Sequence, residues 1–98
     1  MRIIAKKTLK DYWKKEPAAQ TALEAWHAEA KSSLWSSPGD IRNCYGTASI
    51  LKDGRVVFNI GGNKYRLIAA IHYNTQVIYA LHFMTHAEYS KDRWKKVL

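Results

Sequence analysis

Cysteine is nearly absent from this chain, and its scarcity restricts both redox and metal chemistry. Cys44 is the one cysteine among 98 residues, so the chain cannot form an internal disulfide. That fits a reducing compartment, and we expect a cytoplasmic protein in which Cys44 is a small, buried, apolar residue. One cysteine and four scattered histidines make no zinc-binding pattern, and no acidic pair is placed for a metal-dependent nuclease. The sequence therefore predicts no cofactor and no metal site.

Long apolar runs are also missing. The longest uninterrupted one covers residues 67–71, far short of the roughly 20 residues that span a bilayer. Near the N-terminus only Ile3, Ile4 and Ala5 stand together, whereas a secretory signal needs about 7–15 apolar residues. We expect no membrane association and no signal peptide. The length suits one domain over residues 1–98.

Acidic residues are too few to balance the basic ones. Eight Asp and Glu face sixteen Lys and Arg, which leaves a formal charge of +8. Such a field attracts polyanions, meaning RNA, DNA or an acidic protein surface. A merely soluble basic protein is the alternative, but so much charge on so short a chain favours nucleic acid.

The first third of the chain has helical periodicity. Thr8, three residues before Asp11, makes a capping-box-like start for a helix that ends by Glu16, because Pro17 follows. Pro17 suits the first turn of a second helix. The apolar residues of that helix recur at helical spacing: Ala19, Ala22, Leu23, Trp26 and Ala30. The pattern predicts a helical hairpin that lies against a sheet.

From Ala48 onward the pattern changes to strands. After a short strand at residues 3–5 and a helical turn at 40–45, the segments "ASIL", "RVVFNI", "NKYRLIAAIHY" and "VIYALHFM" follow, with a last helix over 85–96. Gly61 and Gly62 suit a two-residue hairpin turn, in which both positions need positive φ. The sequence therefore predicts an α+β fold, with two N-terminal helices packed on an antiparallel sheet and a short C-terminal helix.

The predicted Gly61–Gly62 turn divides the hairpin into two faces. It places Ile60 opposite Asn63 and Phe58 beside Tyr65. One face is then apolar, with Val56, Phe58, Ile60, Tyr65, Leu67, Ala69 and Ile71. The other face is polar, with Arg55, Asn59, Lys64, Arg66 and His72. A three-residue loop before the last strand would send Tyr79, Leu81 and Phe83 to the core and His82 and Met84 to the polar side. We expect the helices to cover the apolar face and the open basic face to carry the function.

Four segments of the chain carry a resemblance to a known family: "RVVFNIGGNKYRLIAAI", "THAEYSK", "MRIIAKKTLKDYWKKEP" and the region of Trp35. With these segments the chain resembles the HigB family of toxins, within the RelE-like superfamily. The most specific parts are "FNIGGNKYRL" and "THAEY". The resemblance implies a small cytoplasmic bacterial toxin that cleaves messenger RNA, typically on the translating ribosome. It also implies neutralisation by a HigA-type antitoxin and two helices packed on an antiparallel sheet.

The resemblance implies site residues as well. The arginine of "KYRL" is Arg66, the tyrosine near the C-terminal helix is Tyr89, and His86 matches a basic or histidine residue shortly before that tyrosine. RelE carries two lysines on the strand that precedes its arginine. Here that strand offers only Arg55 and Asn59 as polar candidates, so the general base stays open.

These residue types suit metal-independent RNA cleavage, in which the 2′-hydroxyl attacks the adjacent phosphate. Arginine can hold two phosphate oxygens, histidine exchanges protons near neutral pH, and tyrosine can stack on a base or orient the phosphate. We expect a catalytic set of Arg66, His86 and Tyr89. The expected RNA-binding residues are Arg55, Asn59, Lys64, Lys91, Arg93 and Lys95.

Each of these residues also has a structural interpretation. His86 could cap the last helix, Tyr89 could pack against the sheet, and the basic tail could offset a helix dipole. His72 and His82 are more typical of surface histidines than of catalysts. Two other functions compete with the toxin hypothesis: a non-catalytic RNA-binding module and a subunit whose basic face docks an acidic protein.

Overall fold

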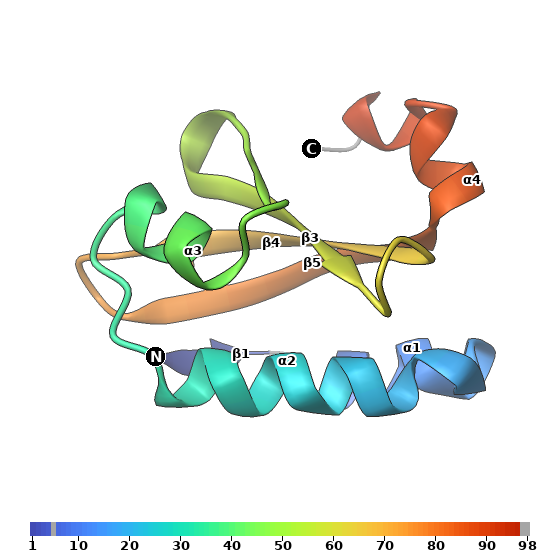
Figure 1. Ribbon diagram of the computed structural model, residues 1–98, viewed down its shortest axis with the longest axis horizontal. Helices are drawn as coiled ribbons and strands as arrows, with labels where there is room; N and C mark the ends of the chain where they lie inside the picture. Colours follow the sequence, from blue (N-terminus) through green and yellow to red (C-terminus); the bar gives the residue numbers. More distant parts are fainter. Residues whose placement is uncertain (5, 97–98) are drawn as a thin grey trace.

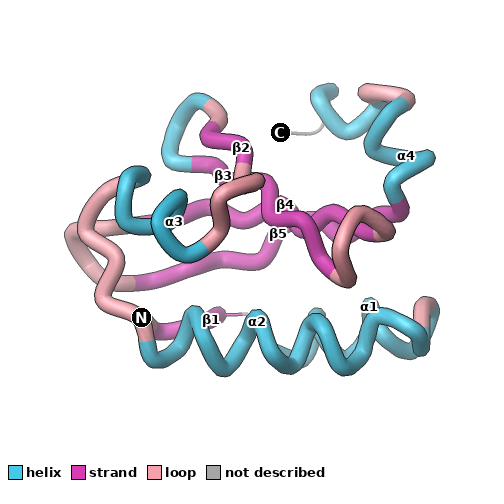
Figure 2. Tube along the Cα trace, viewed as in Figure 1, coloured by secondary structure: helices cyan, strands magenta, loops and turns pink. Residues whose placement is uncertain are grey.

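The computed structural model describes residues 1–4 and 6–96, without the side chains of residues 6–8. Within this part the chain forms four α-helices and a five-stranded mixed sheet, an α+β fold (Figures 1 and 2). The helices are α1 (Lys6–Lys15), α2 (Gln20–Ser32), α3 (Pro38–Cys44) and α4 (His86–Ser90). The strands are β1 (Arg2–Ile4), β2 (Ser49–Ile50), β3 (Arg55–Ile60), β4 (Tyr65–His72) and β5 (Val77–Thr85). Three short 3-10 segments complete the order: η1 (Pro17–Ala19), η2 (Lys52–Gly54) and η3 (Arg93–Lys96).

The turn between α1 and α2 follows from Pro17. Helix α1 ends at Lys15, and Pro17 occupies the first turn of η1, which leads directly into α2. The predicted stop before this proline is therefore confirmed. The predicted cap at Thr8 is wrong, because α1 already begins at Lys6. In Figure 1 the two helices run in opposite directions in a layer below the sheet.

The sheet has the strand order β1-β5-β4-β3-β2. Strands β2 to β5 pair antiparallel, as expected, but β1 adds to β5 in the parallel sense, with Arg2 beside Val77 and Ile4 beside Tyr79. The prediction of a purely antiparallel sheet is thus wrong. The α1–α2 hairpin intervenes between β1 and the rest of the sheet, and it leaves β1 running the same way as β5.

The main core lies on the face of the sheet that the sequence marked as apolar. All seven predicted residues belong to one buried cluster: Val56, Phe58, Ile60, Tyr65, Leu67, Ala69 and Ile71. From the helices, Leu9, Leu23 and Trp26 join the same cluster, and the Trp26 ring meets the Phe58 ring edge-on at 5.3 Å. Full burial of each such side chain is worth about 1.5–3 kcal/mol, so this cluster supplies most of the hydrophobic stabilisation.

The hairpin between β3 and β4 differs from the prediction in its register. Ile60 pairs with Tyr65, not with Asn63, so four residues form the loop, although Gly61 and Gly62 do have φ of 63° and 71°. Phe58 consequently pairs with Leu67. The pairing has moved by two residues, and a shift of two keeps every side chain on its face. The predicted faces are therefore right although the predicted pairs are wrong.

The last hairpin contains an irregularity that the sequence pattern did not reveal. His72 pairs with Val77, so the loop has four residues, and Leu81 stands unpaired between Ala80 and His82 as a β-bulge. Before the bulge Ile78 faces the core and Tyr79 is 40% exposed. The prediction that Tyr79 enters the core is therefore wrong. Beyond the bulge the predicted alternation holds again, with Phe83 packed against the main core.

The other face of the sheet is not the open basic surface that we expected. Val57 and Ile68, which pair across β3 and β4, form a second buried cluster with Trp94, and Met84 packs against it. The predicted continuous helix over 85–96 is instead α4 followed by η3, with Asp92 between them at a φ of 58°. This reversal folds Trp94 back over the sheet, where it covers Val57 and Ile68, the apolar residues on the otherwise polar face.

Helix α3 occupies the expected place, since Pro38–Cys44 contains most of the predicted turn at 40–45. Cys44, its last residue, is exposed. The prediction of a buried cysteine is wrong, because the buried side of this short helix is occupied by Ile41.

Candidate active site

Arg66 lies on the polar face of the sheet, near the start of the central strand β4. It pairs across the strands with Asn59 on β3 and with Met84 on β5. Its side chain is only 7% exposed, so our expectation of a cation in the open is wrong. An unpartnered buried guanidinium would be costly, and this one has several partners.

The guanidinium is held by four acceptors. Nη1 donates to the backbone carbonyls of Tyr65 at 3.1 Å and Asn63 at 3.3 Å. Nη2 donates to Oδ1 of Asn63 at 2.6 Å and contacts Nδ1 of His86 at 2.9 Å. These contacts fix the orientation of the fork and keep a full positive charge beneath the surface.

His86 reaches Arg66 because the first turn of α4 is tightly fixed. Thr85 is the N-cap in a capping box with Glu88, and the His86 N–H donates to the carbonyl of Lys64 at 2.8 Å. His86 is therefore not the cap. Since an arginine carries donors alone, Nδ1 of His86 must accept in this contact, which places the ring hydrogen on Nε2.

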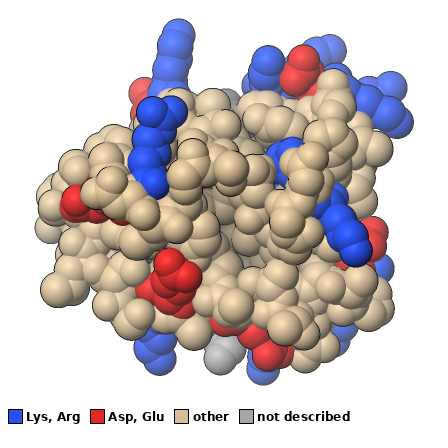
Figure 3. Space-filling model, in the orientation of Figure 1, with Lys and Arg blue, Asp and Glu red and all other residues tan. Residues whose placement is uncertain are grey.

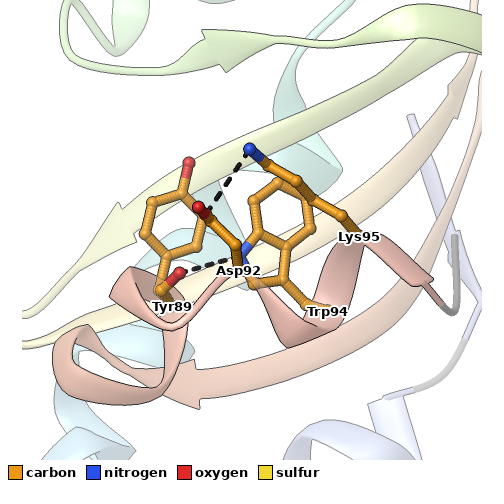
Figure 4. A network of polar contacts seen from close by, with 4 residues as sticks. All are labelled: Tyr89, Asp92, Trp94 and Lys95. Atoms are coloured by element: carbon orange, nitrogen blue, oxygen red, sulfur yellow. Dashed lines mark hydrogen bonds and ion pairs between the residues drawn. The ribbon is translucent and has the colours of Figure 1, made fainter.

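Tyr89 follows His86 by one helical turn and lies over the same guanidinium. The Arg66 Cζ atom is 5.3 Å from the centre of the tyrosine ring, within the range of a cation–π contact. The tyrosine ring also stacks on Trp94, with centroids 4.9 Å apart and planes 9° from parallel (Figure 4). The structure thus brings the three predicted catalytic residues into one cluster, the Arg66–His86–Tyr89 cluster.

The predicted RNA-binding residues separate into two groups by position. Asn59 pairs with Arg66, and Lys64 is exposed in the turn just before it, so both lie beside the Arg66–His86–Tyr89 cluster. Arg55 and Lys95 border a cleft of about 410 Å³ between η2 and η3.

Lys91 and Arg93 line a different hollow, of about 300 Å³, together with His82 and Glu88. His72 is exposed at the far end of β4, where its ring packs edge-on against Tyr79 at 5.2 Å. This position separates His72 from the cluster along the whole length of β4.

The surface around the C-terminal segment is strongly basic. On the face drawn in Figure 3, Lys and Arg side chains gather at the upper right, where Figure 1 places α4 and the segment that follows it. Within that segment, Lys95 forms an ion pair of 3.5 Å with Asp92. The site therefore sits beside the positive region that a polyanion would approach first.

Two residues of the site were missed from the sequence. Asn63 makes the shortest contact to Arg66, and Trp94 supports Tyr89. Asn63 was predicted only as the first residue of a strand, opposite Ile60. The signal for Trp94 was present but unused: it is a large aromatic residue isolated among cations, where burial is the usual explanation for an aromatic side chain.

The described part of the chain contains neither a cluster of metal ligands nor a helix that could span a membrane. Among residues 1–4 and 6–96, no three His, Cys, Asp or Glu side chains gather closely enough to bind a metal ion. Over this same described span, no helix has the length and apolar character needed to cross a bilayer.

Comparison with known proteins identifies the family to which the chain belongs. Residues 19–92 match the description of a RelE-like toxic component of a toxin–antitoxin system. A protein named mRNA interferase toxin HigB from Escherichia coli is 32% identical over 91 residues, covering 91% of this chain and 88% of its own. An mRNA interferase HigB from Shigella flexneri has the same identity and coverage. Another Escherichia coli strain carries an mRNA interferase HigB that is 29% identical over 93 residues, covering 93% of this chain and 90% of its own. The chain belongs to the HigB toxin family.

Proposed function

We propose that this HigB-family protein is an mRNA endoribonuclease and that Arg66, His86 and Tyr89 form its active site. The observation that carries the proposal is the contact of 2.9 Å between Arg66 and His86, with the Tyr89 ring against the same guanidinium. The relatives named mRNA interferases support the activity. The cluster combines a fixed cation and a group that exchanges protons, which metal-independent RNA cleavage needs, with a phenol that can orient the RNA.

In the proposed reaction the ribose 2′-oxygen forms a bond to phosphorus and the bond from phosphorus to the 5′-oxygen breaks. The products are a 2′,3′-cyclic phosphate and a 5′-hydroxyl. One proton leaves the 2′-hydroxyl and one must reach the departing 5′-oxygen. Arg66 holds the phosphate oxygens, whose charge rises in the transition state, and Tyr89 orients the RNA.

The Arg66–His86 contact also suggests how substrate prepares the histidine. Without RNA, the Nδ1 lone pair of His86 accepts from Nη2 of Arg66. A phosphate oxygen is a stronger acceptor for a guanidinium than a neutral imidazole nitrogen is. When phosphate takes over this donor, Nδ1 is released and can accept a proton. We propose His86 as a proton-transfer group on this basis.

Further parts of the proposal concern the partners and the setting. The exposed cations Lys64, Lys91, Arg93 and Lys95, with Arg55 and Asn59, contact the RNA backbone beyond the scissile phosphate. We propose the translating ribosome as the place of cleavage, a HigA-type protein as the antitoxin, and the cytoplasm as the compartment. We also propose the RelE-like arrangement of two N-terminal helices packed on the sheet, which the burial of Leu9 and Trp26 in the main core supports.

The test is induced expression without antitoxin, followed by mapping of mRNA 5′ ends with translation running and with translation blocked. We expect growth arrest and new 5′ ends within coding regions, and ends that vanish in the blocked cells if cleavage needs the ribosome. The His86→Ala variant serves as the matched inactive control. Normal growth and intact transcripts, while folded protein accumulates, would refute the toxin assignment. RNA binding without new 5′ ends would favour a non-catalytic RNA-binding module.

A further inference from the structure

Tyr89 is held by contacts with Trp94 that the catalytic proposal does not explain. Its ring stacks on the indole of Trp94, and the indole Nε1 donates to the backbone carbonyl of Tyr89 at 2.9 Å. One side chain thus contacts the tyrosine at both its ring and its backbone (Figure 4). Trp94 lies just outside residues 19–92, the segment that matches the family description.

Trp94 is itself firmly anchored to the sheet. It is 7% exposed and is buried with Val57 and Ile68, which belong to two paired strands. An indole in such a position contributes a large buried area, and the hydrogen bond from its N–H completes its polar requirements. Trp94 therefore connects α4 to the strand that carries Arg66.

The chain reaches this position through an unusual backbone conformation. Asp92, midway between the two aromatic residues, has a φ of 58°, which is uncommon for a residue other than glycine. Its N–H donates to the carbonyl of Tyr89 at 3.1 Å, and its carboxylate pairs with Lys95. A continued helix would carry residue 94 away from residue 89. The left-handed residue turns the chain back and allows the two rings to stack.

We propose that Trp94 is a positioning residue for cleavage, which holds Tyr89 against Arg66. The Tyr89 ring contacts Arg66 as well as Trp94, so removal of the indole leaves the tyrosine free to leave the guanidinium. Its hydroxyl then loses its defined place at the phosphate. This inference rests on the proposed function, because it assigns a role within the same site.

The main test is single-turnover cleavage by four proteins: wild type, Trp94→Ala, Tyr89→Phe and the double variant. A misplacement of about 1 Å in an active site can cost about 10²-fold in rate, and we expect a loss of that order for Trp94→Ala. In the Tyr89→Phe background the hydroxyl is already absent, so Trp94→Ala should cost much less there. Trp94→Phe keeps a ring to stack on and should recover part of the rate.

A matched control separates positioning from loss of stability. Leu23 is fully buried in the main core, on the opposite face of the sheet from Trp94. Leu23→Ala should lower the melting temperature at least as much as Trp94→Ala, yet cleave at the wild-type rate below its transition. A Trp94→Ala protein that cleaves like wild type would overturn the inference. So would an equal loss in the wild-type and Tyr89→Phe backgrounds, or equal losses in the Trp94 and Leu23 variants.

A second measurement does not depend on activity. Nuclear Overhauser effects between the Tyr89 ring and the Arg66 side chain should be present in wild type, lost in Trp94→Ala and retained in Leu23→Ala. Their persistence in Trp94→Ala would refute the positioning role. Absence of cleavage by wild type would refute the proposed function alone, and the spectra would still decide the role of Trp94.

Discussion

Arg66→Lys tests the reasoning about the site most directly. The substitution keeps a positive charge at the same place on β4 but removes the planar fork. Arg66 now uses two nitrogens, Nη1 for two carbonyls and Nη2 for Asn63 and His86. Lysine offers a single nitrogen, so it cannot occupy both positions, and it cannot hold two phosphate oxygens in a fixed geometry.

The size of the effect follows from these contacts. A hydrogen bond to a charged group is worth about 1.5–3 kcal/mol. The lysine variant loses the hydrogen bonds made by at least one of the two guanidinium nitrogens. We therefore expect the free energy of unfolding to fall by about 1.5–3 kcal/mol. For a domain of this length that lowers the melting temperature by on the order of 10 °C, which leaves the protein folded. Loss of one transition-state donor costs about 10²–10³ in rate, so cleavage should fall much further than stability.

The assay is single-turnover cleavage of mRNA on a programmed ribosome, run well below the melting transition and beside a thermal melt. Lys64→Ala is the matched control, since Lys64 is an exposed cation two residues away. Its loss should weaken binding and leave the rate at saturating substrate near that of wild type.

Two results would refute the reasoning. Arg66→Lys at the wild-type rate would show that charge alone suffices and that the fork has no role. A loss of activity that only follows the unfolded fraction would show that Arg66 is a buried structural cation.

Three further predictions concern other groups. In His86→Asn the amide oxygen can still accept from Arg66 in place of Nδ1, so the variant should keep the wild-type melting temperature. It should nevertheless cleave as poorly as His86→Ala. If a lowered melting temperature were its sole defect, His86 would be a structural residue. Tyr89→Phe should lower cleavage and keep the ring contacts with Arg66, and wild-type cleavage by this variant would remove the hydroxyl from the mechanism. The Asp40 carboxylate accepts from the backbone N–H and the hydroxyl of Ser36, both at 2.9 Å, and these bonds hold the Asp40 pKa below its ordinary value. Because the folded-state pKa is the lower one, this stabilisation is present above the ordinary pKa and is lost as pH falls through the folded value. Thermal melts should therefore separate wild type from Asp40→Asn at neutral pH and converge in strong acid; a constant difference would contradict the assignment.

Much of the site could be predicted from the sequence, because its members occupy short, well-patterned segments. Alternation along β3 and β4 placed Arg66 and Asn59 on the polar face, and a register error of two residues did not disturb that placement. The spacing of three residues put His86 and Tyr89 on one side of a helical turn. Their meeting with Arg66 required the correct pairing of β4 with β5, which brings Arg66 beside Met84.

The burial of Arg66 could not be predicted in the same way. From the strand alone it alternates with apolar residues and should face solvent. It is buried because α4 brings His86 and the Tyr89 ring against the guanidinium. The reversal at Asp92, which returns Trp94 to the Val57–Ile68 pair, could not be predicted either. Aspartate adopts the left-handed conformation only occasionally, so its presence at position 92 does not by itself predict such a reversal. For this reason one long helix was expected where two short ones form.

By itself, the sequence determined the charge, the apolar face of the hairpin and the helix end at Pro17. These features depend on local periodicity, on the fixed φ of proline and on residue chemistry, and none requires distant parts of the chain. The candidate residues Arg66, His86 and Tyr89 came from the resemblance of their segments to the HigB family. The tertiary structure alone decided the parallel pairing of β1, the bulge at Leu81 and the contacts of α4 that bury Arg66. Each of these joins segments far apart in sequence, where the gain from burial outweighs local preference.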